Sequence, residues 1–68
     1  MNGREFVRRA RRYARANGLE WRFEPSRGKG SHGRFWVEER YTTVQYGEIS
    51  RPMLFAMLRQ IGINNREF

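Results

Sequence analysis

The chain has 68 residues, which is enough for one small domain but too few for two domains with separate cores. It contains no cysteine, which excludes disulfide bridges, thiolate nucleophiles and sulfur-ligated zinc sites. With no aspartate and one histidine, the chain shows no ligand spacing for a metal, so we expect neither a metal nor any other cofactor. The longest apolar run, 53–58, is far shorter than the roughly 20 residues that cross a bilayer. We therefore expect a soluble, cytoplasmic protein.

The charge is concentrated in one half of the chain. Of the net charge of +7, the whole excess lies in residues 1–34, whereas residues 35–68 are balanced. Thirteen of the fourteen basic residues are arginine, whose planar fork matches phosphate groups better than the point charge of lysine does. A polyanionic partner is therefore predicted, with nucleic acid, an acidic protein and an anionic membrane surface all open on this evidence.

The N-terminal residues predict an amphipathic helix. Asn2 and Glu5 form a capping-box pattern at its start, and Asn17-Gly18 is typical of its end. A membrane role is disfavoured because alanines make the apolar face shallow. Like charges four residues apart repel one another, so an arginine stripe without interleaved glutamates indicates phosphate contact rather than a merely solvated face. The residues of this stripe are Arg4, Arg8, Arg11 and Arg15.

Three strands are predicted from alternating apolar and polar residues, over 19–24, 34–39 and 41–46. Trp21, Phe23 and Phe35 are expected in the core. Trp36 and Tyr41 should point to the opposite face of the sheet, where they would stack on bases or contact a partner protein. The turn near Glu39-Arg40 contains neither glycine nor asparagine, so the sequence fixes the strand ends there only loosely.

A second helix is predicted after Ser50 or Arg51, because a capping residue precedes an early proline, and Gly62 ends it. Its buried stripe should consist of Leu54, Met57, Leu58 and Ile61, and Phe55 is also expected in the core. The predicted fold is a single α+β domain over residues 1–68, in the order α-β-β-β-α. We expect a three-stranded antiparallel sheet with both helices packed on one face and the other face left open.

A glycine-rich segment separates the first two strands. Gly28, Gly30 and Gly33 match the spacing of a dinucleotide-binding loop, but that motif requires a helix to follow, and a strand follows here. The backbone N–H groups of such a segment form an anion-binding concavity when cations flank it, and a basic hairpin loop without a ligand is the alternative. The flanking cations are Arg27, Lys29 and Arg34.

His32 is the candidate catalytic residue, because histidine is the side chain best suited to proton transfer near neutral pH. Between Ser31 and Gly33 it can approach a phosphodiester closely and take a proton from a ribose 2′-hydroxyl, while nearby cations stabilise the charge that develops on phosphorus. This cleavage would be specific for RNA, since DNA lacks the hydroxyl. The residues alone leave open a loop histidine that only contacts solvent or phosphate.

The chain resembles the HicA family of toxin–antitoxin systems, small RNA-cleaving toxins with a fold like that of the double-stranded-RNA-binding domain. The resemblance is carried by a first helix that ends at Gly18, by residues 28–32 ahead of the second strand, and by the closing residues 58–63. It implies that His32 is catalytic, that messenger RNA is the substrate, and that a HicB-like antitoxin covers the active site. The implied activity is that of an mRNA interferase.

The chain departs from that family at the residue after His32. Many relatives carry a second histidine there, and this chain has Gly33, so a two-histidine mechanism is not available. A general acid would be Lys29 or water, with Glu38 a weaker choice. The backbone N–H groups of Gly30 and Ser31 are expected to stabilise the oxyanion, and Arg27, Lys29 and Arg34 to contact phosphate. Two alternatives remain: a non-catalytic RNA-binding module and a DNA-bound repressor component.

Overall fold

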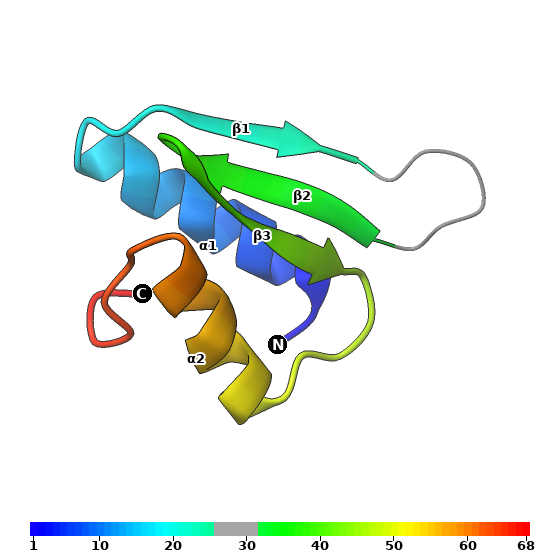
Figure 1. Cartoon of the computed structure of the whole chain (residues 1–68). Coiled ribbons are helices and arrows are strands. Elements are labelled where there is room, and N and C mark those ends of the chain that lie inside the picture. Colours follow the sequence, from blue (N-terminus) through cyan, green and yellow to red (C-terminus); the bar gives the residue numbers. More distant parts are fainter. Residues whose placement is uncertain (26–31) are drawn as a thin grey trace.

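The computed structural model describes residues 1–25 and 32–68 and shows the predicted order of elements (Figure 1). The α+β class and the α-β-β-β-α order are confirmed. The elements are α1 (Gly3–Ala16), β1 (Trp21–Glu24), β2 (His32–Val37), β3 (Arg40–Gln45) and α2 (Arg51–Gln60).

The three strands form one antiparallel sheet in the order β1-β2-β3. All three strands begin or end one or two residues away from their predicted limits. The end of β2 and the start of β3 are set by a tight turn, where Val37 pairs with Arg40 and only Glu38 and Glu39 lie between them. Glu38 adopts a positive φ of 56°, which is unusual without glycine or asparagine and is not indicated by the sequence.

Both helices pack on the same side of the sheet, and this side is called the covered face. Phe6 of α1 meets Phe35 of β2 edge to face, with ring centroids 6.4 Å apart. Gln60 of α2 accepts a hydrogen bond from the hydroxyl of Thr42 in β3. The opposite side, called the open face, carries neither helix (Figure 1). The buried apolar residues of the covered face and its helices are Phe6, Ala10, Phe35, Val37, Val44, Met57, Leu58 and Ile61.

The helix ends follow the sequence prediction, because their determinants are local. The side chain of Asn2 accepts a hydrogen bond from the backbone N–H of Glu5, and Ser50 caps α2 in the same way. Gly18 and Gly62 take positive φ values of 67° and 75° after the last turns of the two helices. These left-handed positions let the chain reverse after each helix, so that Ile63 is buried and Leu19 is half-buried against the core.

Two aromatic residues predicted in the core are not buried. Phe55 is 39% exposed because it lies about 200° around α2 from Met57, whose side of the helix faces the sheet. Trp21 is 37% exposed because it lies at the start of an edge strand, although its ring packs parallel to that of Phe35. Phe68 instead adds to the core by packing against Phe6, with centroids 5.4 Å apart.

Candidate nucleic-acid interface

His32 is the first residue of β2 rather than part of the preceding loop, and its side chain is exposed. It lies opposite Gln45 of β3. Because side chains alternate along a strand, His32, Arg34 and Trp36 share the open face, with about 7 Å between successive members. The structure therefore brings together the predicted catalytic residue and one of the predicted phosphate-binding residues, Arg34.

Two arginines and two aromatic rings from all three strands lie beside one another on the open face. The guanidinium carbon of Arg22 is 4.7 Å from the ring centroid of Trp36, and that of Arg34 is 5.1 Å from Tyr41. The rings of Trp36 and Tyr41 are themselves 4.8 Å apart, tilted by 35°. We call Arg22, Arg34, Trp36 and Tyr41 the cation–aromatic cluster.

A hydrogen bond fixes the indole of the cluster. The Nε1–H of Trp36 donates to Oε1 of Glu24 at 2.7 Å, and the same carboxylate lies 3.9 Å from Arg22. Glu24 is the single carboxylate on the open face of the described strands, whereas Arg22 and Arg34 contribute two positive charges. The face that carries His32 is thus positively charged, and its aromatic side chains are held in place.

Sequence reasoning found Trp36 and Tyr41 on this face but missed Arg22. Strand alternation placed Arg22 on the polar side of its strand, yet its position over Trp36 depends on the β1–β2 register. That register aligns Arg22 with Trp36 and Tyr41 across the sheet. A sequence without a recognisable turn between the strands does not reveal such a register.

Gly33, next to His32, is a glycine for a steric reason. A Cβ atom built there would lie 2.7 Å from the carbonyl oxygen of Glu24 and 2.9 Å from Cζ of Phe23, so β1 passes too close for a side chain. Gly33 also points to the covered face, where it is buried. A second histidine directly after His32 would therefore face away from it.

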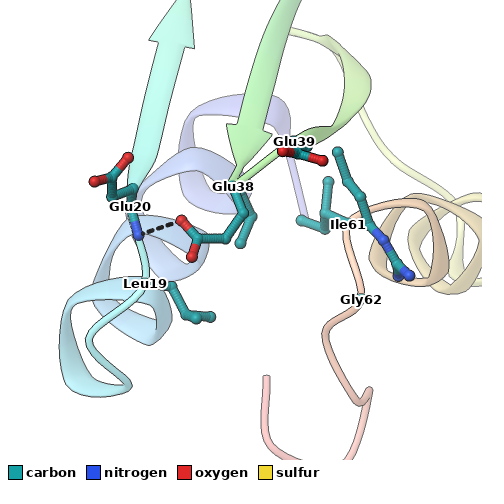
Figure 2. Close-up of a pocket in the computed structure, with 8 residues that line it drawn as sticks. Leu19, Glu20, Glu38, Glu39, Ile61 and Gly62 are labelled. Carbon is teal, nitrogen blue, oxygen red and sulfur yellow. Dashed lines mark hydrogen bonds between the residues drawn. The ribbon is translucent and has the colours of Figure 1, made fainter.

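Four predicted site residues lie outside the described part of the chain: Arg27, Lys29, Gly30 and Ser31. The predicted role of Glu38 as a general acid is wrong. Glu38 lies beyond the opposite end of β2, about 20 Å along the strand from His32. Its carboxylate accepts a hydrogen bond from the backbone N–H of Glu20 at 3.0 Å and so closes the far end of the sheet (Figure 2).

A hollow of about 700 Å³ lies at this far end, and its chemistry is unlike that of the open face (Figure 2). Its apolar walls are formed by Leu19, Val37 and Ile61. Three carboxylates that repel phosphate surround these walls, and one arginine accompanies them. The charged residues that line the hollow are Glu20, Glu38, Glu39 and Arg40.

The arginine stripe of α1 is exposed as predicted, but it lies on another surface. Phe6, Ala10 and Ala14 turn toward the sheet and are buried, so the stripe faces outward from α1. Its members are Arg4, Arg8, Arg11 and Arg15, and the guanidinium carbon of Arg11 lies 5.9 Å from the ring of Trp21.

Within residues 1–25 and 32–68, no helix combines the length and apolar character that a membrane crossing requires. In the same ranges, no three side chains of histidine or glutamate gather as metal ligands would.

Comparisons with protein families, curated proteins and solved structures find no match for the chain.

Proposed function

We propose that the chain is an endoribonuclease that cleaves messenger RNA, with His32 as general base, as its resemblance to HicA toxins implies. The observation that carries the proposal is the exposure of His32 on a positively charged face, with Arg34 about 7 Å away on the same side of β2. A proton acceptor and a phosphate-binding cation at this spacing suit RNA cleavage by the internal 2′-hydroxyl.

In the proposed reaction, the imidazole of His32 removes the proton of the ribose 2′-hydroxyl. The 2′-oxygen attacks the adjacent phosphorus, the bond from phosphorus to the 5′-oxygen breaks, and water protonates the leaving 5′-oxygen. A cyclic 2′,3′-phosphate and a free 5′-hydroxyl result. Arg34 stabilises the negative charge of the phosphorane, and the predicted contacts of Arg27, Lys29 and the Gly30-Ser31 backbone would add to it.

The remainder of the proposal follows the family resemblance. The chain would act as the toxin of a type II toxin–antitoxin system in the cytoplasm, held inactive by a HicB-like antitoxin. The arginine stripe of α1 would add affinity for RNA through phosphate contacts that carry no sequence preference.

The test compares the parent chain with His32→Ala on a long RNA in EDTA, with products separated on a denaturing gel. We expect His32→Ala to lose about 10²- to 10⁴-fold of the cleavage rate, the typical contribution of a general base. Arg59→Ala is the matched control, since it removes an exposed charge from α2 and should cleave normally. DNA of the same sequence should stay intact. Equal cleavage by the parent and His32→Ala would overturn the assignment.

A non-catalytic RNA-binding module is the second candidate, and the cation–aromatic cluster favours it. Rings accompanied by arginines bind nucleic acid without any chemistry. RNA that stays intact with both parent and His32→Ala, but shifts on a native gel with both, would establish this function instead.

A further inference from the structure

We propose that the cation–aromatic cluster binds the bases of a single-stranded stretch of the substrate, next to the bond cleaved at His32. This inference deepens the proposed function, on which it rests for the identity of the substrate as RNA. The site consists of Arg22, Arg34, Trp36 and Tyr41.

The exposed rings favour unpaired bases. Tyr41 is 44% exposed on a sheet face that no helix covers. In an A-form duplex the bases are already stacked on one another, and only edges, sugars and phosphates are accessible. An aromatic side chain gains stacking only from bases that have left the helix, so a duplex leaves this surface unused.

The two arginines lie over the aromatic rings. An incoming base would take their place on the rings, and the phosphates of the same strand would bind the displaced guanidinium groups. The Arg22 side chain is 61% exposed and lies over Trp36 at 4.7 Å, and Arg34 is exposed beside Tyr41 at 5.1 Å. Exposed cation–π contacts are weak, so an incoming base can displace a guanidinium from its ring. The displaced guanidinium then remains within reach of the phosphate of the same strand.

The order of groups along β2 places the stacked base to one side of the cleaved bond. His32, Arg34 and Trp36 follow one another on one face, and the whole span is about 13 Å. Tyr41 lies across from Trp36 in the register of the sheet. The base stacked at Tyr41 therefore belongs to a neighbour of the nucleotide whose 2′-hydroxyl meets His32, and Arg34 receives the phosphate between them.

The charge of the face favours RNA over a protein partner. Glu24, the one carboxylate on this face of the described strands, lies 3.9 Å from Arg22 and accepts the indole N–H of Trp36, so it offsets one of the two guanidinium charges and leaves a net positive charge. A protein partner would need a carboxylate placed against Arg34, whereas any RNA strand supplies phosphates and π-surfaces together.

The experiment measures binding in the His32→Ala background, where the RNA is not consumed. Labelled single-stranded RNA and the same RNA annealed to its complement are titrated with this chain and with chains that also carry Tyr41→Ala or Tyr41→Phe. We expect Tyr41→Ala to weaken single-strand binding by about 5- to 100-fold. Tyr41→Phe, which keeps the ring, should bind like its background, and duplex binding should be unchanged in all three.

A fluorescence measurement reports on the same surface without disrupting it. The chain has two tryptophans, so Trp21→Phe in the His32→Ala background leaves Trp36 as the sole indole. Single-stranded RNA should quench its emission, and duplex RNA should not. The proposal would be overturned if single-stranded RNA binds without changing the emission. It would also be overturned if Tyr41→Ala weakens binding to single-stranded and to double-stranded RNA equally.

The outcomes separate this inference from the proposed function. Cleavage that needs His32, combined with RNA binding indifferent to Tyr41→Ala, would retain the nuclease and refute the base-binding site, leaving the face to a protein partner. Absent cleavage, combined with single-strand binding that depends on Tyr41, would refute the nuclease and retain the base-binding site.

Discussion

The two faces of the sheet differ in burial, and β2 shows this difference within one strand. On the covered face of β2, Phe35 is fully buried and Val37 is 4% exposed. On the open face of the same strand, His32 and Arg34 are exposed and Trp36 is half-buried. Neighbouring residues of β2 therefore lie in different surroundings, because each residue faces opposite to the one before it.

So short a chain leaves one sheet face uncovered, and its two faces are held together in different ways. A domain of this size gains only about 3 to 5 kcal/mol from its core, so every covered position matters to folding. The open face is organised instead by side-chain contacts, with the indole of Trp36 held by Glu24 and flanked by Arg22. Substitutions on the two faces should therefore affect different measurements.

The largest effect is expected from Phe35→Ala on the covered face. It removes a ring that packs against both Phe6 and Trp21, and such truncations cost about 3 to 5 kcal/mol. That loss is comparable to the whole stability of the domain, so the variant should be largely unfolded at 25 °C. Urea titration followed by circular dichroism measures it.

The matched control is Thr43→Ala, an exposed substitution on the open face of β3. It should change the free energy of unfolding by no more than about 0.5 kcal/mol. Similar losses in the two variants would show that the faces do not divide as described.

The second effect is expected at Arg34, in cleavage rather than in stability. Arg34→Ala should lower kcat/KM by about 10- to 100-fold, the range for losing one hydrogen bond to a charged group. Arg34→Lys keeps the charge but loses the planar fork, so its rate should lie between those of Arg34→Ala and the parent. Single-turnover cleavage measures the rates. An equal loss in Arg59→Ala would mean that net charge, rather than position, determines the rate.

What the sequence predicts well in this molecule is local. The caps at Asn2 and Ser50 and the reversals at Gly18 and Gly62 lie where the sequence put them, because each depends on a few neighbouring residues. The strand ends at the β2–β3 turn were less accurate, because the positive φ of Glu38 is imposed by the hairpin and has no sequence signal.

The candidate site was only partly predictable, because part of it depends on how the strands pair and not on neighbouring residues. Alternation along one strand was enough to associate Trp36 with the open face, but Arg22 required the β1–β2 register. Glu38 was a wrong choice of general acid, because the strand predicted over 34–39 already places it at the end away from His32. His32 was predicted in a loop because the glycines before it obscure where β2 begins.

A third, smaller effect tests the outer surface of α1 against the open face. Arg4→Gln with Arg8→Gln should reduce the salt slope of RNA binding by about 1.4, at about 0.7 for each lost contact to a single strand. Stability should rise slightly, because the pair repels at this spacing. Arg51→Gln with Arg59→Gln removes equal charge from α2 and serves as control. An unchanged salt slope in the α1 variant would show that the stripe is a solvated surface that does not contact RNA.

The smallest effect is expected at a contact that touches neither face of the sheet. The hydroxyl of Tyr13 donates a hydrogen bond to Glu67 at 3.0 Å and ties residues 64–68 to α1. This hydrogen bond raises the pKa of Tyr13 above its usual 10.0, and desolvation and the negative charge of Glu67 act in the same direction. Since the folded pKa exceeds the unfolded one, the contribution to stability is complete below pH 10 and is lost as the pH rises through the folded value.

Tyr13→Phe has no proton to lose there, so its free energy of unfolding should fall less than that of the parent as the pH rises above about 10. Urea midpoints at several pH values measure the difference, and comparing the two chains cancels the other groups that titrate in this range. Glu67→Gln keeps an acceptor but removes the charge, and should give an intermediate pH dependence. Parallel pH profiles for the parent and Tyr13→Phe would mean that the hydrogen bond does not hold residues 64–68 in solution.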